Sequence, residues 1–385
     1  MQPSIRVFAN LCLSFLLGLT ADSPRDGEPR IARQLQPFVD RGTLAGAVVL
    51  VATRDKVLSL ETVGYSDVAA KAPMSDDAFF WIASMSKPIT ATALMMLVDE
   101  GKVSLDDPVA KHLPEFRDQM VASEKTSNRI VLKKPSHAIT VREILSHASG
   151  LPFSSALEQP TLDLLPLRVA VASYAMTPLQ FEPGTRFQYS NAGLNTAGRI
   201  VEVVGGMPFE EFLESRLFRP LGMSDTTFRP TEPQLARLAK AYKPTADKTA
   251  LEETKITQLA YPLSDRSRQP MPAGGLFSSA HDLMRFCQMI LGRGLLDGHR
   301  YLSESSVQQM TRRQTSEATK EGYGLGWSIE GKTFGHGGAF ATRMAIDPEH
   351  VLIVVFLVQH AGFPGRDGDK LFPIVMKAAI ESFGK

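Results

Sequence analysis

The sequence contains almost no cysteine. Its only two cysteines are Cys12 and Cys287, and Cys12 lies in an N-terminal segment that we expect to be removed. An intrachain disulfide is then excluded in the mature chain, so stability has to come from a large apolar core. A zinc site built on cysteine pairs is excluded for the same reason. We expect Cys287, within H-D-L-M-R-F-C-Q-M-I-L, to be a small buried apolar residue rather than a reactive thiol.

The sequence also lacks an excess of charge of either sign. It has 42 Lys and Arg residues against 41 Asp and Glu residues, a net charge of +1. That balance gives no support for binding nucleic acid or an anionic membrane surface. Beyond the N-terminal segment no stretch reaches ~18 uninterrupted apolar residues, so we expect no stable membrane insertion of the mature chain.

The N-terminus is typical of a secretory signal. Arg6 precedes the apolar stretch V-F-A-N-L-C-L-S-F-L-L-G-L, and small residues up to Ala21 are followed by a polar run. The apolar stretch is too short to span a membrane. We therefore predict a cleaved signal over residues 1–21 and an exported protein, periplasmic or secreted. The alternative is a buried N-terminal helix.

Strand patterns occur at both ends of the chain, with short helical patterns between them. The runs A-G-A-V-V-L-V-A and V-L-S-L-E-T-V-G, joined by the turn T-R-D-K, predict two strands, and further short runs after residue 322 predict a meander. We therefore predict a mixed α/β sheet, flanked by helices, from residues 28–115 and 275–385. An inserted, mostly helical lobe would span residues 116–274, with a cleft between the two parts.

Ser84 and Lys87 stand at the start of an apolar helical pattern, S-M-S-K-P-I-T-A-T-A-L-M-M. Pro88 is tolerated only in the first turn, so the helix should begin near Ser84. Residues i and i+3 share a helix face, and a lysine of lowered pKa in that position can take the serine proton. Taken alone, the spacing favours an N-cap serine beside a solvated lysine.

Two further motifs carry groups that could assist a serine nucleophile. Tyr189 and Asn191 follow a P-G-T turn, and a phenol near a cationic lysine can have a lowered pKa and act as a general base, while the amide can orient a carbonyl. His336 precedes Gly337 and Gly338, which let a strand approach a ligand closely. An N–H beyond these glycines would suit an oxyanion hole. The plainer interpretations are a core tyrosine with a turn asparagine, and a locally bonded histidine.

The helical pattern V-R-E-I-L-S-H-A-S-G predicts a helix that ends at Gly150. His147 would then stand at the helix C-terminus in a structural role. A catalytic triad built on His147 is disfavoured because no G-x-S-x-G elbow accompanies it.

In their order along the chain, the three motifs resemble those of serine β-lactamases and penicillin-binding proteins. The resemblance is to the branch that holds class C enzymes, D-alanyl-D-alanine carboxypeptidases and esterases. H-A-S-G-L-P, P-L-G-M-S-D-T, A-G-G-L-F-S-S-A-H-D-L and Y-G-L-G-W are similar to stretches of the same branch. The resemblance runs from about residue 30 to the end. It implies a mainly antiparallel sheet of the transpeptidase type and no metal or organic cofactor.

The resemblance also implies a role for each matched residue. Ser84 matches the acylated nucleophile, Lys87 the lysine that activates it, and Tyr189 the tyrosine of the proton relay. The backbone N–H groups of Ser84 and Ala339 match the two donors of the family's oxyanion hole. The residues matched to substrate binding or the third motif are Asn191, His336, Gly337, Gly338 and Ala339.

One departure from the family pattern narrows the expected activity. Class C β-lactamases have Lys-Thr-Gly where this chain has His-Gly-Gly at 336–338, so the permanent charge that anchors a β-lactam carboxylate is missing. We expect an exported serine hydrolase that cleaves small esters, or amides, through an acyl-enzyme. The alternatives are a β-lactamase or a D-Ala-D-Ala carboxypeptidase acting on cell-wall peptides. A non-catalytic β-lactam- or peptidoglycan-binding protein is the alternative of another class.

Overall fold

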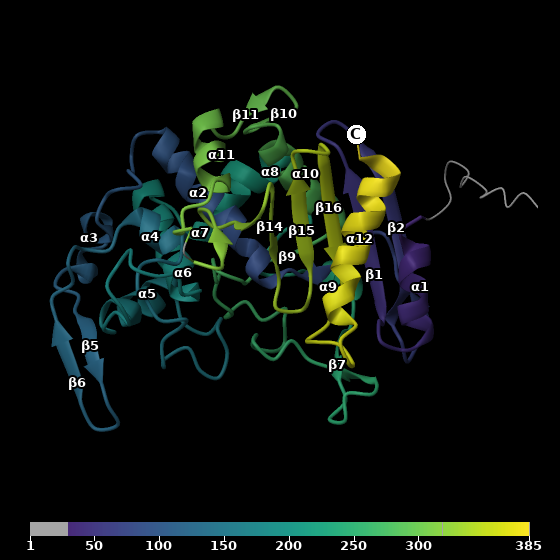
Figure 1. Cartoon of the computed structure of the whole chain (residues 1–385), viewed down its shortest axis with the longest axis horizontal. Helices are drawn as coiled ribbons and strands as arrows, with labels where there is room; N and C mark the ends of the chain where they lie inside the picture. The colour runs from purple at the N-terminus through teal and green to yellow at the C-terminus, as the bar shows by residue number, and fades with distance from the viewer. Residues whose placement is uncertain (1–29, 318, 385) are drawn as a thin grey trace, which may run out of the picture.

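The computed structural model describes residues 30–317 and 319–384. The predicted signal over residues 1–21 lies outside the described residues, as do the first two residues of the predicted sheet region. The main element is an eight-stranded sheet with the order β12-β13-β14-β15-β16-β1-β2-β3 (Figure 1). β1 (Gly46–Ala52) pairs antiparallel with β16 (Leu352–Leu357), so the two ends of the chain meet inside the sheet. The predicted sheet from both termini is confirmed.

The remaining strands of this sheet also pair antiparallel with their neighbours. The predicted T-R-D-K turn is present, with the Thr53 N–H donating to the Lys56 carbonyl at 2.8 Å. The bounds of these remaining strands are β2 (Val57–Asp67), β3 (Ala72–Pro73), β12 (Gly322–Tyr323), β13 (Ser328–Glu330), β14 (Thr333–Gly337) and β15 (Arg343–Asp347).

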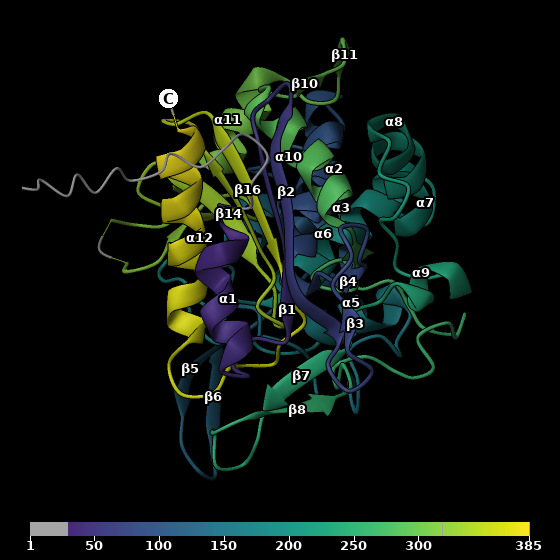
Figure 2. The same ribbon diagram turned by 90° about the vertical axis from the view of Figure 1, so that its right-hand side faces the viewer.

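Helices cover both faces of the sheet (Figure 2). Because side chains alternate along a strand, Val49 of β1 belongs to the apolar cluster under α1 and α12, and Val48 to the larger cluster that includes α2 and α10. Cys287 is buried in the larger cluster, as predicted. The bounds of these helices are α1 (Ala32–Asp40), α2 (Ser86–Asp99), α10 (Ala280–Leu291) and α12 (Gly368–Phe383).

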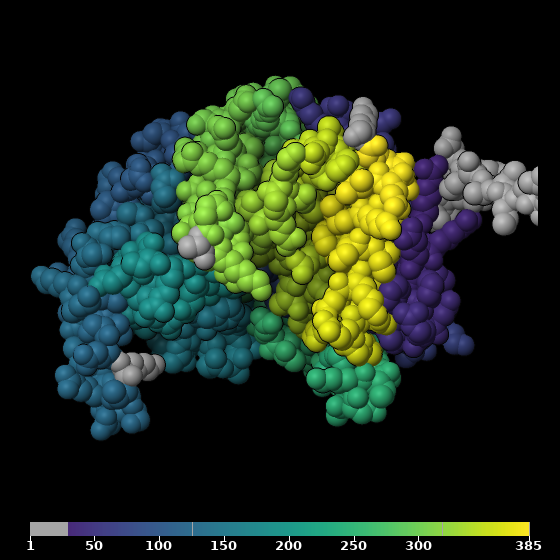
Figure 3. All heavy atoms as spheres, viewed as in Figure 1, coloured from purple at the N-terminus to yellow at the C-terminus, as the bar shows by residue number. Residues whose placement is uncertain are grey.

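In the middle of the chain, residues 109–205 carry four α-helices and lie to one side of the sheet (Figures 1 and 3). Ile89 of α2 and Leu194 of α6 belong to the same apolar cluster, so one core continues from beneath the sheet into this part. The domain boundaries near residues 115 and 274 stay a prediction. The helices in the middle of the chain are α3 (Val109–His112), α4 (Val141–Leu145), α5 (Leu167–Ala175) and α6 (Asn191–Gly205), followed by α7 (Phe209–Leu213), α8 (Arg219–Leu221) and α9 (Glu232–Ala236).

Short elements complete the fold. The hairpin β5–β6 stands at the far end of the helical part, and β7–β8 lies beyond one end of the sheet (Figures 1 and 2). None of the helices among the described residues is long and apolar enough to cross a membrane. The bounds are β4 (Phe80–Trp81), β5 (Val121–Lys125), β6 (Ile130–Lys133), β7 (Ala241–Pro244), β8 (Leu251–Thr254), β9 (Phe277–Ser278), β10 (Leu295–Leu296), β11 (His299–Arg300), α11 (Glu304–Thr311), the 3₁₀ turns η1 (Ala83–Met85) and η2 (Pro114–Phe116), and the π-helical turn η3 (Glu214–Phe218).

Two predicted helix boundaries need correction. The helix predicted to end at Gly150 ends at Leu145, because His147 has a φ of 61° that no α-helix accommodates. The helix predicted to begin near Ser84 begins at Ser86, and Ser84 lies on η1 directly before it. Pro88 is the third residue of α2, within the first turn as expected.

Candidate active site

A cavity of about 300 Å³ lies where η1, the start of α6 and the end of β14 meet. Ser84 and Tyr189 face it, and the fully buried Lys87 lies behind the serine. The structure therefore brings the three sequence motifs together, although about 100 and 150 residues separate them along the chain. The lining residues are Trp81, Ala83, Ser84, Phe153, Tyr189, Asn191, Gln258, Met271, Gly274, Gly337, Gly338 and Ala339.

Lys87 contacts three oxygen atoms from three parts of the chain. Its Nζ lies 3.0 Å from Ser84 Oγ, 2.8 Å from Asn191 Oδ1 and 2.8 Å from the Ala273 carbonyl oxygen. Burial lowers the pKa of Lys87 well below its usual value, because an ammonium loses its hydration and none of the described acidic side chains pairs with it. The side chain is therefore suited to act as a neutral amine.

The three oxygens differ in what they can accept or donate. The amide oxygen of Asn191 and the carbonyl of Ala273 are acceptors only. A neutral Lys87 amine has two hydrogens, which these acceptors take at 2.8 Å each. Its lone pair is then left for the hydroxyl proton of Ser84, 3.0 Å away. This is the arrangement that a general base for a serine nucleophile requires.

Tyr189 lies beside the Ser84–Lys87 pair. Lys87 Nζ is 4.6 Å from the centroid of its ring. Burial raises the pKa of Tyr189 to about 12, and a hydrogen bond with Ser84 works against that rise. The sequence-based expectation of a lowered tyrosine pKa was wrong, because burial disfavours the phenolate. At neutral pH the hydroxyl keeps its proton and is placed to pass one on.

Asn191 is positioned by the N-terminus of α6. Ser190 caps this helix, accepting the Gly193 N–H at 3.1 Å and donating to the Pro152 carbonyl at 2.6 Å. Asn191 Oδ1 faces the lysine, so Nδ2 is the atom left to the cavity, which Asn191 lines. The amide can therefore donate to a substrate carbonyl.

The end of β14 approaches the serine turn because Gly338 lacks a side chain. A Cβ there would lie 2.1 Å from Thr342 Oγ1 and 2.6 Å from the Ile82 carbonyl oxygen. In the described part of the chain, the N–H groups of Ser84 and Ala339 take part in none of the turn and loop hydrogen bonds, and both residues line the cavity. They are the two candidate donors to a carbonyl oxygen that becomes an oxyanion.

His336 is buried behind the cavity and does not line it. Its Nδ1 lies 2.8 Å from the Gly337 carbonyl, an acceptor, so Nδ1 carries the hydrogen. Nε2 then accepts the Tyr323 hydroxyl at 3.0 Å, and burial lowers the pKa of His336 to about 3. A neutral ring with both nitrogens engaged has no donor left for a substrate carboxylate. In this arrangement the ring holds the strand in place, and direct substrate binding by His336 stays a prediction.

Sequence reasoning missed two residues around the site, Ala273 and Tyr323, and gave a third, His147, only a structural role at a helix end. Ala273 supplies the carbonyl on Lys87, and Tyr323 bonds to His336. The His147 ring lies 4.5 Å from the rings of both Tyr189 and Tyr323, and its Nδ1 accepts the Ser190 N–H at 3.1 Å. The signal available was the family resemblance, because all three residues lie in stretches that carry it.

A buried ion pair joins two loops that border the cavity. Arg268 Nε lies 2.7 Å from Asp163 Oδ2, with side-chain exposures of only 2% and 1%. Asp163 also accepts the Ala260 N–H at 2.9 Å, and Arg268 donates to the Leu263 carbonyl at 2.8 Å. The segment that carries Gln258 and Arg268 is thereby tied to the loop that carries Asp163.

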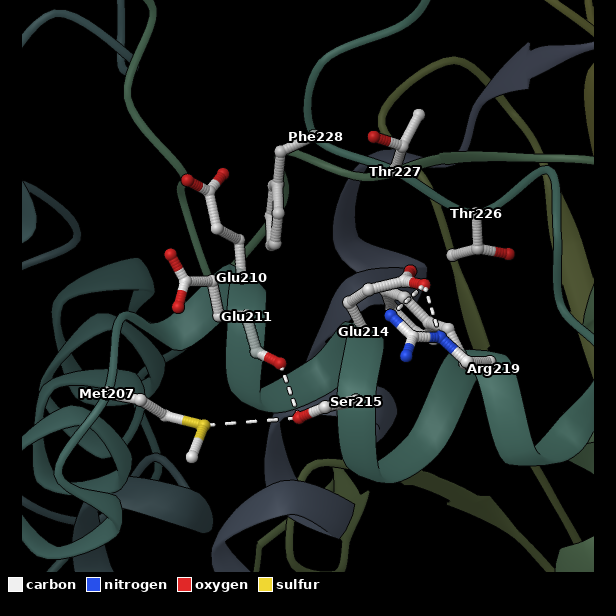
Figure 4. Close-up of a pocket in the computed structure, with 10 residues that line it drawn as sticks. Met207, Glu210, Glu211, Glu214, Ser215, Arg219, Thr226, Thr227 and Phe228 are labelled. Atoms are coloured by element: carbon white, nitrogen blue, oxygen red, sulfur yellow. Dashed lines mark hydrogen bonds and ion pairs between the residues drawn. The ribbon is translucent and has the colours of Figure 1, made fainter.

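A second and larger cavity, of about 530 Å³, lies beside α7 and the π-helical turn (Figure 4). Its serine, Ser215, donates to the backbone carbonyl of Glu211 at 2.7 Å, and Glu214 is paired with Arg219. No lysine or histidine is among its lining residues. It therefore lacks the base that a nucleophilic serine needs.

Comparisons with known proteins agree with this geometry. The beta-lactamase family profile matches residues 31–373. An uncharacterized protein of Mycobacterium tuberculosis is 33% identical over 364 residues, 85% of this chain and 88% of that protein. A putative D-alanyl-D-alanine carboxypeptidase of Salmonella typhimurium is 27% identical over 306 residues, 70% of this chain and 66% of that protein. The solved structure of EstCE1, described as a hydrolase with promiscuous acyltransferase activity, matches with a TM-score of 0.74 at 25% identity, over 91% of this chain and 96% of that chain.

Proposed function

The chain belongs to the beta-lactamase family of serine hydrolases, and within that family we propose that it is a carboxylesterase acting through an acyl-enzyme on Ser84. The observation that carries the proposal is the environment of Lys87. Its amine is buried, contacts the serine hydroxyl at 3.0 Å, and is oriented by two acceptors at 2.8 Å. A serine activated in this way attacks an acyl carbonyl.

The proposed first step acylates the serine. Lys87 takes the hydroxyl proton of Ser84 as Oγ bonds to the ester carbonyl carbon, and the carbonyl oxygen becomes an oxyanion held by the N–H groups of Ser84 and Ala339. When the tetrahedral intermediate collapses, the bond to the alcohol oxygen breaks. Tyr189 passes a proton to that oxygen and regains one from the Lys87 ammonium, so the alcohol leaves neutral.

The second step releases the acid. Water enters the position that the alcohol has left, and the same base system removes its proton as it attacks the acyl carbon. The oxyanion again forms between the two N–H groups. Collapse breaks the bond to Ser84 Oγ, which regains its proton, and the carboxylic acid departs.

The lining of the cavity favours esters over β-lactams and D-Ala-D-Ala peptides. None of the described residues that line it carries a formal charge, and Trp81, Phe153 and Met271 give it apolar walls. β-Lactams and D-Ala-D-Ala peptides both carry a carboxylate, which would lose hydration there without gaining a cationic partner. A neutral acyl ester loses little on entry, and its alkoxide leaving group needs less protonation than an amine.

Hydrolysis of D-Ala-D-Ala peptides is the second candidate. It is favoured by the Salmonella relative, named a putative D-alanyl-D-alanine carboxypeptidase, and it would suit an exported protein, which we propose from the N-terminal sequence. A non-catalytic binding protein is disfavoured, because binding alone does not require a buried lysine beside the serine. We propose small molecules as partners and no nucleic acid.

A substrate panel tests the proposal. We expect the protein to hydrolyse p-nitrophenyl butyrate, with much lower kcat/KM for nitrocefin and for a D-Ala-D-Ala peptide, and the Ser84→Ala variant to turn over none of them. A higher kcat/KM for the peptide or for nitrocefin than for the ester would replace the esterase assignment with the corresponding alternative. No turnover of any of the three, together with no adduct on Ser84, would favour the binding protein.

A further inference from the structure

A buried chain of hydrogen bonds begins at Lys87 and leads away from the cavity. Lys87 Nζ donates to the Ala273 carbonyl at 2.8 Å, and the N–H of the same residue donates to Asn195 Oδ1 at 2.9 Å. Asn195 Nδ2 donates to the Tyr174 hydroxyl at 3.0 Å, and that hydroxyl donates to Glu158 Oε1 at 2.5 Å. The side chains in the chain are at most 2% exposed.

The direction of each bond follows from the groups involved. The N–H of Ala273 can only donate, so the Asn195 atom facing it is the amide oxygen, and the amide nitrogen faces Tyr174. The hydroxyl of Tyr174 accepts from that nitrogen and donates its own hydrogen to Glu158. Every donor therefore points away from Lys87 and toward the carboxylate. The three bonds from the Ala273 N–H to Glu158 strengthen one another, and they hold in place the residue whose carbonyl faces Lys87.

Glu158 ends the chain as an acceptor on both oxygens. Oε2 accepts the Ser155 N–H at 2.7 Å, while Oε1 accepts Tyr174. Burial raises the pKa of Glu158, and these two hydrogen bonds oppose that rise. Two donors and a 2.5 Å contact suit an ionised carboxylate. Among the described residues no basic side chain forms an ion pair with Glu158. Its negative charge therefore acts mainly on the groups that donate hydrogen bonds to it.

We propose that Glu158 is a positioning residue that acts on Lys87 through Tyr174, Asn195 and the backbone of Ala273. The carboxylate strengthens the hold of Tyr174 and Asn195 on the Ala273 N–H, and this fixes the direction of the Ala273 carbonyl. That carbonyl holds Nζ in place and stabilises the ammonium that forms when Lys87 takes the serine proton. Glu158 itself touches neither the cavity nor Ser84. This inference rests on the proposed role of Lys87 as the base.

The other ionisable groups facing Lys87 do not supply such a charge. They are Tyr189, His147 and His336, and burial keeps the first protonated and the two histidines neutral. Among the described residues, the carboxylate of Glu158 is thus the negative charge that hydrogen bonds and the Ala273 backbone link to Lys87. Removing that charge should make Lys87 a weaker base.

The test is the pH dependence of p-nitrophenyl butyrate hydrolysis in Glu158→Gln. Glutamine has the same shape as glutamate, but only its amide oxygen can accept the Ser155 N–H. Its amide nitrogen then faces Tyr174 and cannot accept the tyrosine hydrogen, so the alignment of the bonds is lost. We expect kcat/KM to fall about tenfold at its plateau and the acid limb to move to lower pH by about half a unit, because the ammonium of Lys87 is less stable. Tyr174→Phe breaks the chain at its third bond and should shift the limb in the same direction.

The control is Ser173→Ala, which removes a neighbouring buried hydroxyl bonded to Ser155 Oγ at 2.8 Å but outside the chain. Its acid limb should stay at the parent position. If Glu158 only supported the fold, Glu158→Gln would loosen the site and hydrate Lys87. The acid limb would then stay in place or move to higher pH, and either result overturns the proposal. An inactive parent protein would instead refute the proposed function, so the two failures are distinguishable.

Discussion

Lys87 Nζ lies 2.8 Å from Asn191 Oδ1, a contact that joins the first motif on α2 to the second at the start of α6. Because the amide oxygen is turned to the lysine, the amide nitrogen is left to the cavity, and because that oxygen only accepts, it takes one hydrogen of the amine. One hydrogen bond thus orients both the base and the substrate-binding amide.

The pH dependence of ester hydrolysis should show that Lys87 loses its proton at a pH well below that of an ordinary lysine. Burial lowers its pKa well below the ordinary lysine value, so kcat/KM should rise with pH through a limb that is complete well before pH 10. Lys87→Arg, which keeps a charge that cannot be lost, should reduce kcat/KM by about 10³-fold or more. A rate that climbs steadily to pH 10 in the parent protein would show an ordinary lysine.

Replacing Tyr189 by phenylalanine removes the relay hydroxyl and keeps the ring beside Lys87. We expect kcat for p-nitrophenyl butyrate to fall by about 10²- to 10⁴-fold, with little change in the thermal unfolding midpoint. Tyr65→Phe, on an exposed part of β2, is the control and should leave both quantities unchanged. An unaltered kcat in Tyr189→Phe would remove this tyrosine from the proton path.

Adding one methyl group at Gly338 should disturb the oxyanion site. In Gly338→Ala the Cβ would lie 2.6 Å from the Ile82 carbonyl oxygen, so β14 must move away from the serine turn, and we expect kcat to fall at least about tenfold. Gly331→Ala, in the turn before β14, adds a Cβ that meets nothing within 4 Å, and its φ of +62° confines the cost to the stability of that turn. Equal kinetics in the two variants would contradict the close approach.

Breaking the buried ion pair should destabilise the fold. Arg268→Met leaves Asp163 charged and buried, at a cost of about 3–5 kcal/mol in the free energy of unfolding, measured by urea denaturation. The double variant Asp163→Leu with Arg268→Met removes the stranded charge and should regain part of that loss. A loss below about 1 kcal/mol in the single variant would indicate that solvent reaches the pair.

Much of the fold could be predicted from local patterns. The continuous β-branched run at 45–52 indicated a strand covered on both faces, and β1 is buried along its whole length. The helix boundary at Gly150 could not be predicted, because the sequence gives no sign that His147 takes a left-handed conformation. That conformation is set by packing of its ring between Tyr189 and Tyr323, which come from distant parts of the chain.

The residues of the site could be predicted from the sequence, but their pKa values and hydrogen-bond partners could not. The motifs placed Ser84, Lys87 and Tyr189 in one cluster, which the structure forms. The direction of the Tyr189 pKa and the engagement of both nitrogens of His336 depend on burial and on partners such as Tyr323. A single sequence does not encode these contacts locally, so they emerge only from the assembled fold.

Acylation of Ser84 can be observed by mass spectrometry of the intact protein after brief reaction with p-nitrophenyl butyrate or a fluorophosphonate probe, followed by peptide mapping. We predict one butyryl or phosphonyl group per chain, located on Ser84 and absent from Ser84→Ala. A label on any other residue, or the same label in Ser84→Ala, would contradict the account.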